Sequence, residues 1–256
     1  MLRDVLRGSW RLAHSARGKP LRVSVRLPWL FLSFFSDWRK FNRLGGSALF
    51  SDIAPALLDR SSVSQTGGGH YFFQDIWALK ILETTKPQLH VDIGSRIDGF
   101  VGQATAICPV TYIDIRKPSF SLPGLEVRDG SVLQLPFEDN SVASLSCLHV
   151  VEHIGLGRYG DPIDPDGTRK ALNELQRVLG VSGQLLFSMP IGKERTEFNA
   201  QRVWNPLRPL EVLSSLTLLE FSAVDDAGEF VNGAIPGDFI EARYACGLYR
   251  FTKASK

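Results

Sequence analysis

The stretch HVDIGSRIDGF, residues 90–100, decides the fold of this chain. It starts as a buried strand, reaches Asp92 and Gly94 where the strand ends, and turns into a helix that begins at Gly99. A strand that passes through a glycine turn into a helix is the opening unit of an alternating α/β fold. The glycines are not spaced as GxGxxG, the pattern that lets backbone approach a pyrophosphate, and this disfavours a nicotinamide enzyme.

Strands and helices continue to alternate around this stretch. An amphipathic helix precedes it, and a later helix from about residue 167 to 179 has its apolar positions on one face until Gly180 stops it. Such alternation predicts an α/β Rossmann-like sheet, mainly parallel, with a closing antiparallel strand. One further strand is expected to end at residue 114. The other expected strands span residues 125–128, 142–148, 184–189, 216–221 and 247–252.

The N-terminal part differs in charge from the rest of the chain. Residues 1–43 hold ten basic and two acidic residues, a balance of +8, whereas the remainder carries −6. We therefore expect a basic and aromatic helical extension over residues 1–66 and a globular domain over residues 67–256. Overall charge is close to neutral, and we expect no nucleic-acid partner.

A basic stripe of Arg3, Arg7 and Arg11 marks an expected helix in this extension. The helix can lie on an anionic membrane surface as a peripheral contact, or it can pack on the main domain with a solvated basic face. The apolar run over 27–35 has nine residues, against about 20 for a membrane-spanning helix. The aromatic run over 29–41 can cover an acceptor site, a partner surface or the core.

Cys108, Cys147 and Cys246 show no CxxC or zinc-type spacing. Cys147 and Cys246 lie in apolar runs typical of buried strands, where a reduced thiol behaves as a small hydrophobic group. These cysteines indicate a reducing compartment, and no signal peptide is evident. The expected location is the cytoplasm, where the protein can also lie peripherally at the inner membrane surface.

Carboxylates follow three successive strands of the predicted sheet. Asp92 ends the first strand, and Asp114 ends the second, about where a Rossmann-type fold hydrogen-bonds ribose hydroxyls. Asp129 ends the third, where its carboxylate can accept from an adenine amino group while Gly130 and Ser131 offer backbone to the ring edge. Each acid alone is commonly a capping or loop residue, but the three in this order favour a nucleoside-type cofactor.

Three longer segments extend the pattern: DGSVLQLPFEDNSV at 129–142, the strand entering HVVEH at 149–153, and ALNELQRVLGVSGQLLFSMP at 171–190. Their order resembles the class I methyltransferases that depend on S-adenosylmethionine (SAM). GHYFFQDIW at 69–77, GLGRYGDPIDPDG at 155–167 and EFNAQRVW at 197–204 resemble, more narrowly, a methyltransferase-like family known as domain of unknown function number 268. Its bacterial members are often associated with surface-polysaccharide loci. The likeness covers roughly residues 67–252.

The resemblance implies that SAM is the cofactor of the domain over 67–256. It implies that Tyr71, Phe72 and Gln74 close over the cofactor, and that the lining consists of Asp92, Gly94, Ser95, Gly99, Asp114, Asp129, Gly130 and Ser131. Two positions of the usual glycine motif instead hold Arg96 and Asp98, which leaves the binding of the methionyl carboxylate open.

The HVVEH segment supplies the candidate catalytic residues His149, Glu152 and His153, which would share one face of a helix. Either histidine can take a proton from an acceptor hydroxyl, since imidazole titrates near neutral pH. Alternatively, the three can hold a divalent metal, resembling the ExxEH cluster of certain quinone-pathway O-methyltransferases, although no metal is predicted. HxxEH is also the inverzincin protease signature, which the surrounding pattern does not support. The residues can also simply shape the loop.

Polar loops beyond the strands supply a candidate acceptor site. Its predicted substrate-binding residues are Arg158, Tyr159, Asp161, Asn199 and Arg202, which suit a sugar or sugar phosphate. The leading hypothesis is therefore SAM-dependent O-methylation of a saccharide or glycan precursor. A non-catalytic SAM-fold module that scaffolds a glycan-assembly complex is the alternative, favoured by the altered glycine turn. The sequence leaves the oligomeric state open.

Overall fold

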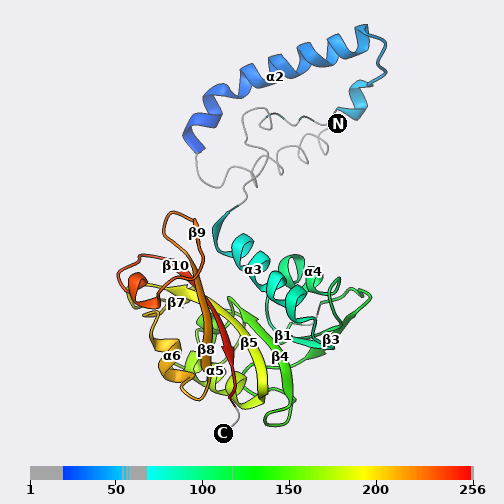
Figure 1. Cartoon of the computed structure of the whole chain (residues 1–256). Helices are drawn as coiled ribbons and strands as arrows, with labels where there is room; N and C mark the ends of the chain where they lie inside the picture. The colour runs from blue at the N-terminus through cyan, green and yellow to red at the C-terminus, as the bar shows by residue number, and fades with distance from the viewer. Residues whose placement is uncertain (1–19, 54, 56, 58–67, 117, 255–256) are drawn as a thin grey trace. The chain divides into compact units, whose positions relative to one another are not determined.

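The computed structural model describes residues 20–53, 55, 57, 68–116 and 118–254 (Figure 1). The chain divides into two compact units, Met1–Thr66 and Gly67–Lys256, which we describe separately. The expected basic helix with Arg3, Arg7 and Arg11 lies outside the described residues. In the described part of the chain, none of the helices is long and apolar enough to cross a membrane.

The first unit is built on a long helix, α2 (Pro20–Arg43), followed by the 3-10 turn η1 (Phe50–Asp52). The aromatic run of the sequence lies in this helix. The Phe35 ring stacks on Phe50 with centroids 6.3 Å apart, and the Trp38 indole N–H donates to the carbonyl of Ala48 over 2.9 Å. The segment after α2 therefore folds back onto the helix that precedes it. Trp29 stays 75% exposed.

The second unit contains, in its described part, an eight-stranded sheet with the order β3-β2-β1-β4-β5-β10-β8-β9. β3, β2, β1, β4 and β5 are parallel, and β10 lies antiparallel between β5 and β8. The predicted mainly parallel sheet with an antiparallel closing strand is confirmed. The strands are β1 (His90–Ile93), β2 (Val110–Asp114), β3 (Leu125–Asp129), β4 (Val142–Leu148), β5 (Leu179–Ile191), β8 (Thr217–Val224), β9 (Phe230–Val231) and β10 (Ala245–Thr252). A separate hairpin pairs β6 (Arg195–Glu197) with β7 (Gln201–Val203).

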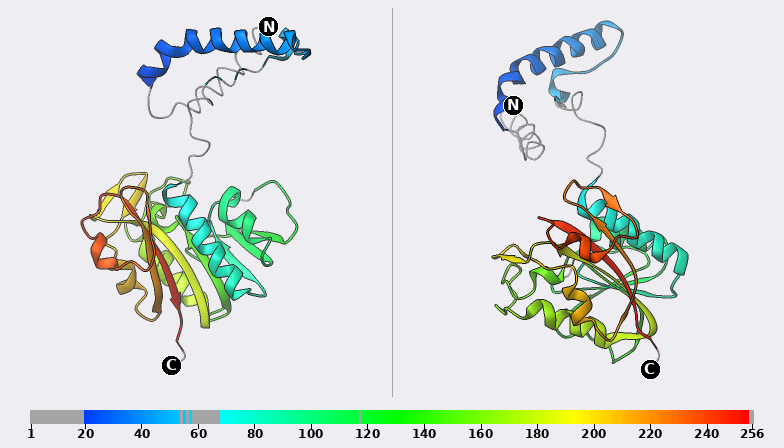
Figure 2. Two further views of the ribbon diagram at one scale, coloured as in Figure 1. Left: turned by 45° about the horizontal axis from the view of Figure 1, so that its top comes forward. Right: turned by 60° about the vertical axis from the view of Figure 1, so that its left-hand side comes forward.

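Helices cover both faces of this sheet (Figure 2). α3 (Gly69–Thr85) and α4 (Gly102–Ala104) lie on one face, while α5 (Gly167–Val178) and α6 (Arg208–Val212) lie on the other. Two clusters of buried side chains fill the spaces between the layers, one around Leu172 and Leu175 of α5 and one around Trp77 and Leu82 of α3. The short 3-10 turns η4 (Val151–His153) and η5 (Pro236–Phe239) lie in the loops.

Two elements differ most from the sequence-based expectation. The helix after β1 is short: a π-helical turn, η3 (Ile97–Val101), leads into the three residues of α4. Gly99 adopts non-helical angles within it (φ −115°, ψ −108°), which interrupts the regular helix expected there. β5 begins at Leu179, five residues earlier than expected, because Leu179 already pairs with Val142 of β4. The register then shifts, and regular pairing of the two strands resumes at Gln184.

Candidate functional site

A cavity of about 470 Å³ opens at the carboxyl ends of the parallel strands. The strand order reverses between β1 and β4, and ligands of open α/β sheets bind at such a switch point. The volume lies in the range of small-molecule and cofactor sites. Its lining is Ile93, Gly94, Ile113, Asp114, Ile115, Arg116, Gly130, Ser131, Val132, Leu133, His149, Val150, His153, Ile154, Tyr159, Gly160, Asp161 and Pro162.

Asp92 lies behind this lining and holds the turn that forms the floor. It is fully buried, and its carboxylate accepts hydrogen bonds from the Ser95 backbone N–H over 3.0 Å, from the Ser95 hydroxyl over 2.7 Å, and from the Ser146 hydroxyl. Ser95 Oγ in turn accepts from the Leu148 N–H over 3.0 Å, which ties the turn to β4. Burial raises the pKa of Asp92 to about 7, although the serine donors oppose the shift. Asp92 and Ser95 therefore support the cavity without lining it.

Asp114 lines the cavity directly. Its Oδ2 accepts from the Tyr112 hydroxyl over 2.8 Å, and its Oδ1 accepts from the Arg116 backbone N–H over 2.7 Å. These two bonds fix the carboxylate in place at the end of β2. A fixed carboxylate with remaining acceptor capacity can bind a pair of ribose hydroxyls.

Two glycines allow close approach to a ligand here. Gly94 has a φ of 71°, a conformation that other residues adopt at a cost, and a Cβ there would lie 3.0 Å from Val150. A Cβ on Gly130 would lie 2.8 Å from the Ile113 side chain. Backbone rather than side chain therefore forms this part of the wall.

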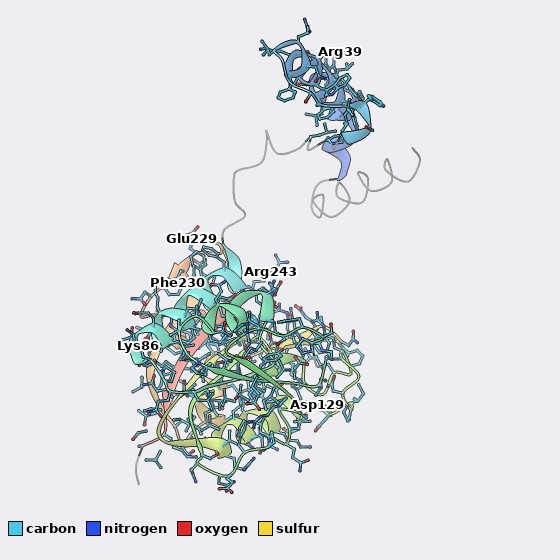
Figure 3. All side chains as sticks on the ribbon, turned by 90° about the vertical axis from the view of Figure 1, so that its right-hand side faces the viewer. Arg39, Lys86, Asp129, Glu229, Phe230 and Arg243 are labelled. Carbon is cyan, nitrogen blue, oxygen red and sulfur yellow. The ribbon has the colours of Figure 1, made fainter. Side chains whose placement is uncertain are left out.

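Besides Asp92 and Ser95, two more predicted cofactor residues do not line the cavity. Asp129 is exposed at the domain surface (Figure 3), and the cavity wall begins at the next residue, Gly130. Gly99 packs against Asp75, whose carboxylate oxygen occupies the space that a Cβ would take. Gly94, Asp114, Gly130 and Ser131 are the predicted residues that the structure brings to the wall.

Several apolar residues of the cavity wall were not predicted from the sequence. Ile115 follows Asp114 and is 45% exposed, and Val132 and Leu133 follow Ser131. An apolar residue next to a strand-end carboxylate is the signal that could have identified them. Together they offer apolar surface to a flat base beside the carboxylate that can hold a ribose.

The predicted covering residues lie at the start of α3. The Tyr71 ring packs against His149 with centroids 5.0 Å apart, and the Arg96 guanidinium lies 4.8 Å from the Tyr71 centroid. Phe72 is 45% exposed and contacts Phe73 instead. Gln74 is buried, and its Oε1 accepts from the Ser188 hydroxyl over 2.5 Å. Of the three, Tyr71 contacts a cavity residue.

His149 does not belong to the helical turn that was expected for HVVEH. The 3-10 turn η4 starts at Val151, and His149 precedes it with a φ of 55°. Its Nδ1 lies 2.7 Å from Glu152 Oε1, both side chains being buried. Burial lowers the pKa of His149, but Cys246 and the Glu152 carboxylate raise it more, so that the pKa lies well above its usual value.

His153 has the opposite electrostatic character. Its Nδ1 lies 2.7 Å from the Ala200 carbonyl, which can only accept, and we place the Nδ1 proton in this bond. Arg158 Nη1 lies 3.3 Å from the same Nδ1, and His153 Nε2 lies 3.7 Å from Glu152 Oε1. Burial lowers the pKa of His153 despite the Glu152 carboxylate nearby. A neutral imidazole with a free lone pair on the cavity wall can act as a general base.

The loop after η4 brings part of the predicted acceptor site to the cavity. The Tyr159 ring lies 4.1 Å from the Arg116 guanidinium carbon and meets His153 edge-on. Asp161 lines the cavity, but its carboxylate accepts from the N–H groups of Gly155 over 2.6 Å and of Tyr159 over 3.3 Å. Burial opposes these donors, and the net pKa of Asp161 is lowered. Asp161 therefore shapes the loop.

The other three predicted acceptor residues are not in the cavity wall. Arg158 donates to the Ala200 carbonyl over 2.8 Å. Asn199 is exposed in the β6–β7 turn. Arg202 is 5% exposed, and its guanidinium donates to the carbonyls of Ile154 over 2.6 Å and Asp164 over 3.1 Å. Its guanidinium also donates to the Thr168 hydroxyl over 3.1 Å, and Arg202 thus joins the acceptor loop and the start of α5 to β7.

Residues 138–227 match the profile of a family described as "Caenorhabditis protein of unknown function, DUF268". A search of curated protein sequences gives no match. Among solved structures, the chain resembles a "putative methyltransferase" from Haloferax volcanii, solved with the Trm112 methyltransferase activator. The two are 15% identical, with a TM-score of 0.53, over 73% of this chain and 91% of that chain.

The chain also resembles the Burkholderia thailandensis 1,6-didemethyltoxoflavin-N1-methyltransferase, solved with 1,6-didemethyltoxoflavin and S-adenosylhomocysteine. Here the identity is 15% and the TM-score 0.51, over 71% of this chain and 79% of that chain. Likeness at this level shows the fold. The second unit has the Rossmann-like fold of class I SAM-dependent methyltransferases, and the resemblance to domain family 268 is confirmed over residues 138–227.

Proposed function

We propose that this chain is a SAM-dependent methyltransferase that transfers a methyl group to a hydroxyl of a saccharide or glycan precursor. One observation carries the proposal: a cavity of cofactor size at the strand-order switch point combines the fixed Asp114 carboxylate with a wall of glycine backbone. SAM has no pyrophosphate, so the absence of a GxGxxG turn does not count against it.

The residues of the wall fit the parts of SAM. Asp114 would accept from the ribose hydroxyls, Ile115 and Val132 would flank the adenine, and Gly94 would leave room for the methionyl part. The altered turn also supplies a cation, Arg96, whose guanidinium lies against the Tyr71 ring and pairs with Asp98 over 2.8 Å. When bound, SAM supplies an electrophilic methyl group.

The chain's own contribution to the reaction is orientation and proton removal. Holding an acceptor oxygen in line with the transferred methyl supplies most of the rate enhancement in such a transfer. His153 Nε2 would take the hydroxyl proton, because burial lowers the pKa of His153 and the Ala200 carbonyl accepts from its Nδ1. His149 is less suited to this role, because its imidazole is buried and its Nδ1 is paired with the Glu152 carboxylate over 2.7 Å.

The choice of a saccharide acceptor has its support in the chemistry of the cavity rim. Tyr159 and Arg116 of the cavity wall pack together, and the Arg158 guanidinium, outside the wall, lies 5.2 Å from the Tyr159 ring centroid. Such a set suits a sugar ring or a sugar phosphate, whose hydroxyls and oxygens accept hydrogen bonds. Residues 67–256 would carry this activity, with residues 1–66 as an accessory element.

Calorimetric titration of the full chain tests the cofactor assignment. SAM and its demethylated product should bind with micromolar affinity, and NAD should not. Replacing Asp114 with Ala removes a charged acceptor worth roughly 1.5–3 kcal/mol, a loss of about 10-fold to 100-fold in SAM affinity. Asp238→Ala, at an exposed aspartate outside the cavity, is the matched control. Unchanged SAM affinity in a folded Asp114→Ala variant would refute the assignment. SAM binding without turnover on any saccharide acceptor would favour the scaffold alternative.

A further inference from the structure

Three potential metal ligands from distant parts of the sequence meet beside the cavity. His70 lies in the first turn of α3, His149 follows β4, and Cys246 lies in β10. One ligand atom from each residue lies within 4.8 Å of the others. Cys246 is fully buried and His149 is 8% exposed. The HVVEH trio itself does not form this group, since Glu152 and His153 are not among its members.

Each histidine is held through one nitrogen, which leaves the other free. His149 Nδ1 lies 2.7 Å from Glu152 Oε1, and His149 Nε2 is buried with no hydrogen-bond partner among the described residues. His70 Nε2 lies 3.2 Å from the Tyr244 carbonyl, which can only accept, so His70 Nδ1 holds the lone pair. Metal-binding histidines typically donate their second N–H to a carboxylate or a backbone carbonyl in this way.

Aromatic rings pack around the two imidazoles. The His70 and His149 rings stack with centroids 5.3 Å apart, and the Tyr244 ring stacks on His70 at 4.9 Å. Tyr71 packs on His149 from the side. A buried nitrogen without a partner is costly unless something occupies the space that it faces. A cation between the three residues would provide that partner.

We propose that His70, His149 and Cys246 form a binding site for a thiophilic transition metal ion, with zinc as the expected occupant. One thiolate and two imidazoles suit zinc, whereas magnesium and calcium prefer oxygen ligands. Tetrahedral zinc with bonds of about 2.0–2.3 Å places its ligand atoms roughly 3.3–3.8 Å apart. To bind one ion, the three ligand atoms need to close by about an ångström. The His70 ring also has to turn out of its stack on His149, because stacked rings point their nitrogens in parallel directions. Three protein ligands leave one coordination position open, next to a wall residue of the cavity.

This inference is independent of the proposed function, because it concerns metal binding alone. The test uses the full chain, reduced and freed of metal with a chelator, and titrated with cobalt as a spectroscopic probe. Cobalt should bind with a stoichiometry of one, showing the thiolate charge-transfer band and the d–d bands of a tetrahedral site, and zinc should displace it. Cys246→Ser should abolish the thiolate band. Cys108→Ser, which changes a buried thiol elsewhere in the domain, should leave it intact.

Two further variants separate ligands from supporting residues. His70→Ala removes a partly exposed ligand and should weaken zinc binding by more than about 100-fold. Glu152→Gln changes the carboxylate that pairs with His149 and also lies near His153, and it should weaken zinc binding by about 10-fold to 100-fold, the usual effect of an outer-shell partner. Circular dichroism checks that each variant is folded. The proposal is overturned if the wild-type chain gives no thiolate band with cobalt, if folded Cys246→Ser retains the band, or if folded His70→Ala binds zinc as tightly as the wild type.

Discussion

Replacing Asp92 with Asn should remove part of the pH dependence of the free energy of unfolding. The buried Asp92 carboxyl has its pKa raised from 3.8 to about 7, chiefly by burial. Asn has nearly the same shape, its carbonyl can accept from the Ser95 N–H, and its amide can donate to the hydroxyls of Ser95 and Ser146, which can accept. The variant therefore removes the titration while keeping the turn.

The sign and size of the effect follow from proton linkage. Between pH 3.8 and about 7 the folded state keeps the Asp92 proton while the unfolded state loses it, so the wild type loses stability as the pH rises through this window. The shift of about three pH units corresponds to roughly 4 kcal/mol at about 1.4 kcal/mol per unit. About 3 kcal/mol of this falls between pH 4.5 and pH 8. The introduced asparagine does not titrate, and the variant escapes this loss.

The assay is urea denaturation of both proteins at several pH values from 4.5 to 8. His90 contributes an opposite trend, because burial lowers its pKa to about 3 and its stabilisation is lost as the pH falls below 6.5. His90 is present in both proteins, so its contribution cancels in the difference between them. The free energy of unfolding of Asp92→Asn should rise by about 3 kcal/mol relative to wild type from pH 4.5 to 8. Parallel curves for the two proteins would refute the reasoning, and Asp238→Asn should give parallel curves as the exposed control.

Two other outcomes are expected. Leu175→Ala, at a fully buried position of α5, should lower the free energy of unfolding by about 2–5 kcal/mol in urea denaturation at an unchanged m-value, and a loss below about 1 kcal/mol would contradict the packing. His153→Ala should lower methyl transfer by roughly 10²–10⁴-fold, measured as release of the demethylated cofactor, with SAM affinity nearly unchanged. Near-normal turnover in that variant would remove His153 from the role of general base.

Local sequence patterns determined the order and type of most elements. The alternation of apolar runs with one-faced helices predicted the parallel sheet, and the face of α5 that carries Leu172 and Leu175 is the buried one. Carboxylates at successive strand ends located the edge of the sheet where the cavity lies, because strands of one direction end at the same edge. These features depend on residues close together in the sequence, so the periodicity of apolar residues is enough to predict them.

Only the tertiary structure decided which side chains face the cavity and which hold it from behind. Asp92 and Asp114 look alike in sequence, yet Asp92 turns inward to Ser95 and Ser146 while Asp114 faces the cavity. The sequence position of Cys246 gave no indication of a metal-binding partner. Cys246 lies near His149 because β10 pairs antiparallel with β5. Strand order and side-chain direction arise from contacts between distant segments, and a local pattern carries no record of them.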